Sequence, residues 1–324
     1  MPTALLVPPS AAHQDVLDAV LRARLRAQQQ QTVDPLFSDP EGLLRQYGRI
    51  LSAVPGAGDI PFEMWDHLPR MLQVWSEHRL TIVLKSRQIG ISWLLAAYAL
   101  CVAREQYGAN VLMLSMGEDE AADLLDKARF IESRLPPRFR ARKGRDNRSE
   151  LEFPESRSRI VALPATKDAG RGQTATLVVL DEYASHAYAE ESFLSIKPTI
   201  DAGGRMLVVS TAKGYGGAFA DLWDAAGGMA ITKSEGAFWE PKDKMPGPNG
   251  YYPVFVDWTA DPRRDQAWYD AKKSETPPGK MAQEYPSNPE EAFIKSGRPV
   301  FDYDVVKSFD PVAPRRGYLH TYAS

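Results

Sequence analysis

Short runs of continuous apolar residues alternate with helix-like segments through the middle of this 324-residue chain, and this alternation constrains the fold most strongly. The runs carry apolar residues at successive positions, which is typical of strands buried on both faces. Residues 91–108 and 118–135, which follow the first two runs, have the length and apolar spacing of helices. The pattern predicts an α/β fold with a mostly parallel central sheet flanked by helices. The strand-like runs lie at residues 79–84, 110–116, 150–153, 158–164, 174–180, 205–210 and 251–258.

Composition places the chain among ordinary globular proteins, with 44% hydrophobic and 25% charged residues. Its apolar stretches are too short to cross a membrane, and its first residues lack the basic and apolar regions of a secretory signal. Cys101 is the single cysteine, which excludes an internal disulfide and a metal site built from several cysteines. We therefore expect an intracellular protein with no membrane partner.

Residues 1–60 are expected to form an N-terminal part of their own. Within it, residues 14–30 have the apolar spacing of a helix whose opposite face is rich in arginine. A connector that contains proline and glycine follows and ends near residue 61. The α/β pattern begins there.

The segment VLKSRQIGISW, residues 83–93, has most of a phosphate-binding loop. The usual GxxxxGK[ST] loop ends in a glycine, a lysine and a hydroxyl residue. Gly90 and Ser92 occupy their expected places, but Ile91 stands in the lysine position and Lys85 in the first glycine position. A loop at a helix N-terminus offers N–H groups to phosphate, and the Ser92 hydroxyl could ligate Mg²⁺. Either the loop has lost its nucleotide, or Lys85 reaches the phosphates from the other end.

Two adjacent acids, Asp181 and Glu182, follow the apolar run TLVVL. Burying carboxylates is costly without a cation or another partner, so this placement favours a functional pair over solvated acids at a strand end. Asp181 would hold the Mg²⁺ shell, and Glu182 would orient and deprotonate an attacking water.

A third run, MLVVSTAKG, ends in the hydroxyl pair Ser210 and Thr211, followed by Ala212. Such a pair can sense the γ-phosphate of a nucleotide and couple its state to the rest of the protein. Together the three features predict a nucleotide hydrolase with an additional strand between the phosphate-loop strand and the acidic strand. Ligands of such a sheet bind at the carboxyl ends of its strands, where all three features lie.

Four stretches, in order, resemble the ATPase domain of the large terminases of tailed phages, the motors that pump DNA into procapsids. They are KSRQIGIS, RGQTATLVVLDEYAS, VVSTAKG and KMAQEYPSNPEEAFIKSGRPVF. The resemblance covers residues 61–301 and implies a P-loop NTPase of the RecA/ASCE-like class that uses ATP and Mg²⁺. The family's second domain is a nuclease, so residues 302–324 are expected to be a linker toward a domain absent from this chain, and nuclease activity is not expected.

The resemblance also implies roles for single residues. Some large terminases carry their lysine at the start of the loop, and Lys85 matches that position. Arg87 matches the arginine of the family's S-R-Q core and would add a forked donor to phosphate. Arg171 looks like an arginine that in some members acts catalytically on a neighbouring subunit's ATP. The ATP-binding set implied in this way is Lys85, Ser86, Arg87, Gln88, Gly90, Ile91, Ser92, Trp65 and His67.

The expected adenine contacts depart from the family pattern. Members often have an aromatic residue followed by glutamine upstream of the loop, and here Leu68 occupies the glutamine position. Trp65 or His67 could stack on the base, or Trp65 could simply pack in the core.

As partners, the resemblance implies double-stranded DNA, a portal protein, a small terminase subunit and further copies of the chain in a homo-oligomeric ring, a pentamer. The implied location is the host cytoplasm, with transient docking on the procapsid portal. With a net charge of -3, DNA contact must be local, and the stretch RFRARKGRDNR is the candidate unless it is a solvated surface loop. Its DNA-binding candidates are Arg140, Arg142, Lys143 and Arg145.

Two other functions stay open on sequence grounds. A helicase-like, DNA-dependent ATPase would carry further motifs in a second RecA-like domain, and none is evident. A degenerate nucleotide-binding scaffold would explain Ile91, but the retained Glu182 argues against it because a pure binding site has no need of a water-activating base.

Overall fold

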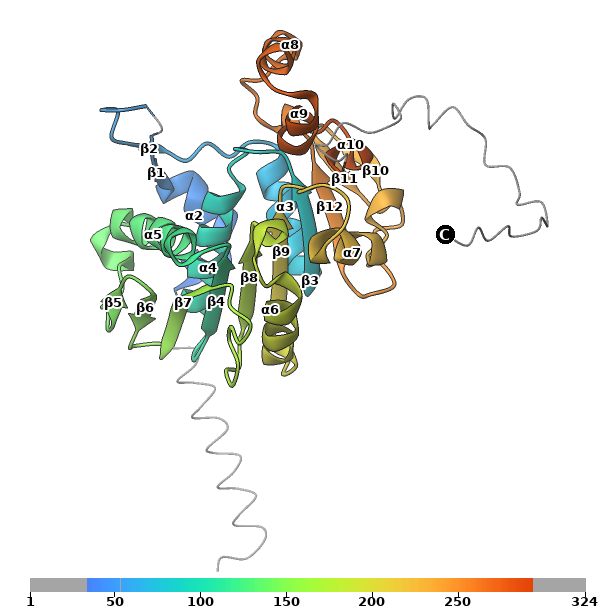
Figure 1. Cartoon of the computed structure of the whole chain (residues 1–324). Helices are drawn as coiled ribbons and strands as arrows, with labels where there is room; N and C mark the ends of the chain where they lie inside the picture. Colours follow the sequence, from blue (N-terminus) through green and yellow to red (C-terminus); the bar gives the residue numbers. More distant parts are fainter. Residues whose placement is uncertain (1–33, 53, 294–324) are drawn as a thin grey trace, which may run out of the picture.

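The computed structural model describes residues 34–52 and 54–293 (Figure 1). The expected helix at 14–30 and the expected linker at 302–324 lie outside the described residues. Within those residues, no helix is both long and apolar enough to cross a membrane.

A ten-stranded sheet forms the centre of the described chain, in the order β10-β11-β12-β3-β9-β8-β4-β7-β6-β5 (Figure 1). The strands from β12 to β7 are parallel, whereas β10, β11, β6 and β5 add antiparallel pairs at the two edges. This confirms the predicted mostly parallel sheet. The strands are β3 Leu80–Lys85, β4 Asn110–Ser115, β5 Asp146–Asn147, β6 Glu150–Phe153, β7 Ser158–Pro164, β8 Leu177–Asp181, β9 Arg205–Ser210, β10 Thr232–Glu235, β11 Phe238–Glu240 and β12 Tyr252–Val256.

The strand β9 lies between β3, which leads into the phosphate loop, and β8, which ends in the acids. The additional strand expected between these two is therefore present. Because β3, β9 and β8 are parallel, their carboxyl ends meet at one edge of the sheet. The geometry of the candidate site follows from this order.

Helices cover both faces of the sheet, and alternate residues of each strand enter different cores. In β3, Val83 joins the core under α2 to α5, while Ile82 and Leu84 join the core under α6 and α7. The same alternation explains why the strands are apolar at successive positions. The helices are α2 Pro40–Tyr47, α3 His67–Glu77, α4 Ile91–Glu105, α5 Glu118–Arg134, α6 Ala189–Ile196 and α7 Ala218–Ala225.

The segment before residue 61 packs onto the α/β body. Phe37 and the α2 residues Leu43 and Leu44 are buried in the same core as α4. A small antiparallel hairpin follows, formed by β1 (Arg49–Leu51) and β2 (Asp59–Pro61). The domain boundary at residue 61 stays a prediction, since packing continues across it.

The last described elements, α8 (Gln266–Glu275), α9 (Pro278–Glu284) and α10 (Pro289–Ala292), gather at the top of Figure 1. A separate aromatic cluster holds α8 and α9 together. It consists of Trp258, Trp268, Tyr269, Met281 and Tyr285. We call residues 258–285 the C-terminal helical unit.

Candidate active site at the edge of the sheet

The phosphate loop joins the end of β3 to the start of α4. Gly90 immediately precedes the helix with φ 81°, a left-handed conformation that residues with a Cβ adopt only rarely. The amide of Ser86 donates to the Val256 carbonyl, and no acceptor among the described residues is found for the amides of Gln88 and Gly90. The loop therefore offers free N–H groups at a helix N-terminus, as a phosphate site requires.

Lys85 is the last residue of β3, and its ammonium is paired with the predicted catalytic base. Its Nζ donates to Glu182 Oε1 at 2.8 Å, across 97 residues of sequence, and the lysine side chain is only 5% exposed. Burial alone would lower the pKa of Lys85, but the carboxylates of Glu182 and Asp181 outweigh it and raise the pKa. The cation is thus fixed in its charged form beside the two acids.

Glu182 stands in a left-handed backbone conformation, with φ 50°, directly after β8. Its Oε2 accepts hydrogen bonds from the Thr211 amide at 3.3 Å and the Thr211 hydroxyl at 3.2 Å. Burial would raise the pKa of Glu182, but Lys85 and these bonds lower it below its usual range. The carboxylate is therefore ionised at neutral pH and connected to the segment predicted to couple hydrolysis to motion.

Asp181 is buried and lacks a cation in direct contact among the described residues. The Ser92 hydroxyl donates to its Oδ2 at 3.3 Å, and the Glu182 amide donates to its Oδ1 at 3.1 Å. Burial raises the pKa of Asp181 in spite of the nearby Lys85. A hydroxyl and a desolvated carboxylate side by side fit the needs of Mg²⁺, which binds few protein oxygens and keeps several waters. No group of three or more His, Cys, Asp or Glu residues assembles a metal site within residues 34–52 and 54–293.

The rest of the coupling segment is tied to the acidic loop. The Ser210 side chain accepts a hydrogen bond from the Ala184 amide at 3.0 Å, and Ala212 is buried. His186, which we did not single out from the sequence, contacts the Asp181 carbonyl through Nε2 at 2.9 Å. These contacts fix the turn that carries both acids.

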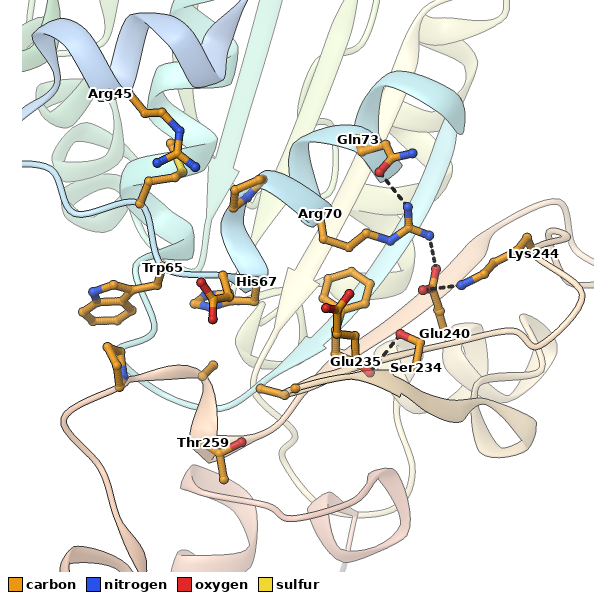
Figure 2. A pocket seen from close by; sticks show the side chains of 18 residues that line it. Arg45, Trp65, His67, Arg70, Gln73, Ser234, Glu235, Glu240, Lys244 and Thr259 are labelled. Carbon is orange, nitrogen blue, oxygen red and sulfur yellow. Dashed lines mark hydrogen bonds and ion pairs between the residues drawn. The ribbon is translucent and has the colours of Figure 1, made fainter.

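A cavity of about 1030 Å³ lies beside the loop, between α3 and the β10–β11 hairpin (Figure 2). His67 donates from Nε2 to the Ile89 carbonyl at 2.8 Å, and burial lowers its pKa to about 4. His67 therefore supports the loop as a neutral side chain. Trp65 is half-buried, and the Arg263 guanidinium lies 5.1 Å from its ring centroid.

At the opposite end of this cavity, neighbouring side chains compensate the negative charge of Glu240 (Figure 2). It accepts hydrogen bonds from Arg70 Nη2 and the Tyr252 hydroxyl, each at 2.7 Å, and pairs with Lys244. Burial would raise the pKa of Glu240, but these partners lower it to about 2. At the Trp65 end, by contrast, the indole lies beside the single guanidinium of Arg263.

The two predicted arginines lie in different settings. Arg87 is paired with Glu284 of α9, Nη1 to Oε2, at 2.9 Å. Sequence reasoning assigned no role to Glu284, although it lies in the last stretch that carried the resemblance. Arg171 is 75% exposed and pairs with Asp168 at 2.9 Å on a turn whose glycines on either side have positive φ. It projects from the surface and makes no ion pair with Asp181 or Glu182 of its own chain.

Acidic side chains neutralise much of the positive charge of the predicted DNA-binding stretch. Lys143 pairs with Asp146 at 3.2 Å and with the buried Glu132 at 3.5 Å, and Arg145 pairs with Glu150 at 2.6 Å. The Arg140 guanidinium donates to the Leu135 carbonyl. Of the four candidates, only Arg142 has no hydrogen-bond or ion-pair partner within the described part of the chain, so the free positive charge is small.

Comparison with known proteins identifies the family. Residues 82–297 match the family described as terminase large subunit, T4likevirus-type, N-terminal. The ATPase domain of the Thermus phage P74-26 large terminase, as a single-site mutant, superposes with a TM-score of 0.54 at 19% identity, over 70% of this chain and 94% of that one. The bacteriophage HK97 large terminase gives 0.53 at 15% identity, over 76% of this chain and 54% of that one, so this chain spans about half of it. These structures share the fold, and the family match covers most of the chain: it belongs to the terminase large subunits of phages, in the N-terminal region that forms their DNA-packaging ATPase.

Proposed function

We propose that this chain binds Mg-ATP at the carboxyl ends of β3, β8 and β9 and hydrolyses it to drive double-stranded DNA into a procapsid. One observation carries the proposal. Glu182, the predicted base, contacts both Lys85, the predicted cation, and Thr211, the predicted coupling residue. Three motifs far apart in sequence meet at one edge of the sheet.

The contacts favour a simple order of events. The phosphates bind at the free amides before α4 and attract the ammonium of Lys85. The ammonium then interacts with both the phosphates and Glu182. Glu182 then has an oxygen available to accept a proton from the attacking water. The water oxygen bonds to the γ-phosphorus, the bond from that phosphorus to the ADP oxygen breaks, and the proton passes to Glu182 and later to phosphate.

Ser92 and Asp181 are the residues that would hold Mg²⁺. When bound, the ion neutralises charge that develops on the phosphate oxygens. The ion would also compensate the Asp181 carboxylate, whose pKa is raised by burial.

We place the adenine at the Trp65 end of the cavity, where the half-buried indole can stack on a base. His67 supports the loop from below by its bond to the Ile89 carbonyl and is not expected to stack. Leu68, in the position of the family's glutamine, is fully buried and has no polar group to bind the base. Selectivity for adenine would therefore depend on the shape of the cavity and on stacking.

The motor is expected to act as a homo-oligomeric ring, a pentamer, on the portal protein, supplied with DNA by a small terminase subunit. It would be located in the host cytoplasm and dock transiently on the procapsid. The projecting Arg171 is suited to reach the ATP of a neighbouring subunit, which its exposure and the absence of an ion pair with Asp181 or Glu182 support.

The test is Glu182→Gln, measured as phosphate release with Mg-ATP in the presence and absence of double-stranded DNA. Loss of the base is expected to lower kcat by about 10²–10⁴-fold. ATP affinity should be kept, since Asp181 and the loop remain. The exposed Glu190→Gln on α6 is the matched control and should behave as wild type. Turnover of Glu182→Gln within a few-fold of wild type would exclude this residue as the base.

A further inference from the structure

The end of α9 is attached to the phosphate loop through one residue. The main-chain carbonyl of Glu284 accepts hydrogen bonds from the Arg87 amide at 2.9 Å and from the Ser86 hydroxyl at 3.1 Å. Its carboxylate Oε2 lies 2.9 Å from Arg87 Nη1. Both the backbone and the side chain of Arg87 are therefore held by Glu284.

A second residue of the same unit also contacts the loop. Arg264 donates from Nη1 to the Arg87 carbonyl at 3.0 Å. Its side chain is 5% exposed, pairs with the buried Asp261, and lies over the rings of Trp268 and Tyr285. The C-terminal helical unit thus contacts the loop through Glu284 and through Arg264, which packs against the unit's aromatic cluster.

The two partners of the Arg87–Glu284 ion pair differ in their exposure to solvent. The Arg87 side chain is 59% exposed, which lets it approach a bound phosphate, whereas the Glu284 side chain is 24% exposed. Its Oε2 is inaccessible to solvent and accepts no well-aligned hydrogen bond, so the charge of Arg87 is its main compensation. If Arg87 leaves, a buried carboxylate oxygen loses its partner, which is costly unless α9 moves and admits water.

We propose that Glu284 competes with nucleotide phosphate for Arg87 and that this exchange links nucleotide occupancy to the C-terminal helical unit. Phosphate offers the fork of Arg87 more charge and more acceptors than one carboxylate does. Transfer of Arg87 to phosphate therefore loosens α9, and α9 in its resting position weakens nucleotide binding by the same factor. The inference rests on the proposed nucleotide site and assigns Glu284 the role of positioning residue for Arg87.

The test is hydrogen–deuterium exchange of the full chain with and without the β,γ-imido analogue of ATP, together with the Kd of that analogue. In wild type, the analogue should slow exchange in residues 85–92 and speed it in α9. In Glu284→Gln, the neutral amide no longer competes, so the analogue should bind several-fold more tightly and the exchange rate of α9 should no longer respond. Glu290→Gln, an exposed acid of α10 without a side-chain partner in the described chain, is the matched control.

The outcomes separate the two proposals. A wild-type chain that binds no analogue contradicts the nucleotide site itself. Binding with no change in α9 exchange overturns the link while leaving the site intact. Weaker binding by a folded Glu284→Gln chain would assign Glu284 a purely structural supporting role, because removing a competitor cannot weaken the ligand.

Discussion

Ion pairs of similar length occur in two regions: at the ends of β3 and β8, and in the basic stretch at 138–148. The pairs differ in how far their side chains are exposed to solvent. Lys85 lies 2.8 Å from Glu182 with a side-chain exposure of 5%, and Arg145 lies 2.6 Å from Glu150 with an exposure of 60%. Charges attract far more strongly where water is excluded, and they cost far more when left unpaired there. The length of an ion pair therefore does not tell which region matters more for function. Because the Lys85–Glu182 pair is the buried one, we expect the functional site at the sheet edge.

The largest expected effect would break this comparison, because it comes from an exposed arginine. Arg171→Ala should lower ATP hydrolysis by assembled rings by about 10³-fold, the scale of a lost arginine finger, while the isolated chain keeps its slow turnover. The measurement is phosphate release by verified rings and by single chains. Mixing Arg171→Ala with Glu182→Gln should restore part of the activity, since one interface then joins an intact Glu182 to an intact Arg171. Verified mixed rings without recovery would argue against action between subunits.

Lys85→Ala should give the next largest effect and would sharpen the contrast with Arg145→Ala. We expect nucleotide affinity to fall by about 10–100-fold, the scale of one or two charge-assisted hydrogen bonds. The fold should lose about 3–5 kcal/mol, since Asp181 and Glu182 are left without their cation. Arg145→Ala should cost less than about 1 kcal/mol and leave nucleotide binding unchanged.

Calorimetric titration and chemical unfolding measure both effects of Lys85→Ala. Ile91→Val is a second control, because it keeps the buried aliphatic side chain in the position of the usual loop lysine. Nucleotide binding that depends on Ile91 and not on Lys85 would contradict the assignment of the loop.

His67 provides a pH test of the buried region. Its folded-state pKa of about 4 lies below the usual value of 6.5, so the unfolded chain takes up the proton first. Stability is complete above about pH 6.5 and is lost as the pH falls toward 4, by up to about 3 kcal/mol. Urea unfolding at pH 7 and pH 5 should show a smaller loss for His67→Gln, which keeps an N–H donor for the Ile89 carbonyl. Equal losses in both chains would mean that His67 is not buried in its neutral form.

The smallest effects are expected in the basic stretch. Arg142→Ala should weaken binding of double-stranded DNA only a few-fold and lower the slope of log affinity against log salt by about one, as for one lost phosphate contact. Arg145→Ala should change the slope less, because its charge is already compensated by Glu150. Fluorescence anisotropy at several salt concentrations measures both, and a large loss for Arg145→Ala would show that the surface pairs open on DNA.

The parallel strands and the order of motifs could be predicted from sequence because buried strands carry a continuous apolar signal. Of the antiparallel strands at the edges, β6 could be predicted, but β5, β10 and β11 could not. β10 is TKSE, exposed at every position, and has no apolar pattern to detect. Its place in the sheet follows from pairing with β11, which is a tertiary contact.

The site residues could be predicted by type and position, but their partners could not. The contact of Lys85 with Glu182 spans 97 residues, and that of Ser86 with Glu284 spans 198. Trp65 or His67 was expected to stack on the adenine, which stays a prediction, but the bond of His67 to the Ile89 carbonyl becomes visible only when α3 is packed beside the loop. Local patterns specify which residues can do chemistry, and the fold decides which of them are already occupied.

The position of Lys85 at the end of a strand also has an evolutionary consequence. Ile91, which stands in the usual lysine position, is 2% exposed in the core beneath α4, so a lysine there would bury an unpaired ammonium unless the core changed as well. Loss of the lysine from position 85 would leave two acids without their cation. Moving the charge from one end of the loop to the other thus requires at least two substitutions, and either one alone produces an impaired motor. Lineages descended from a chain of this kind should therefore retain their lysine at the start of the loop, which makes its position a durable marker of ancestry.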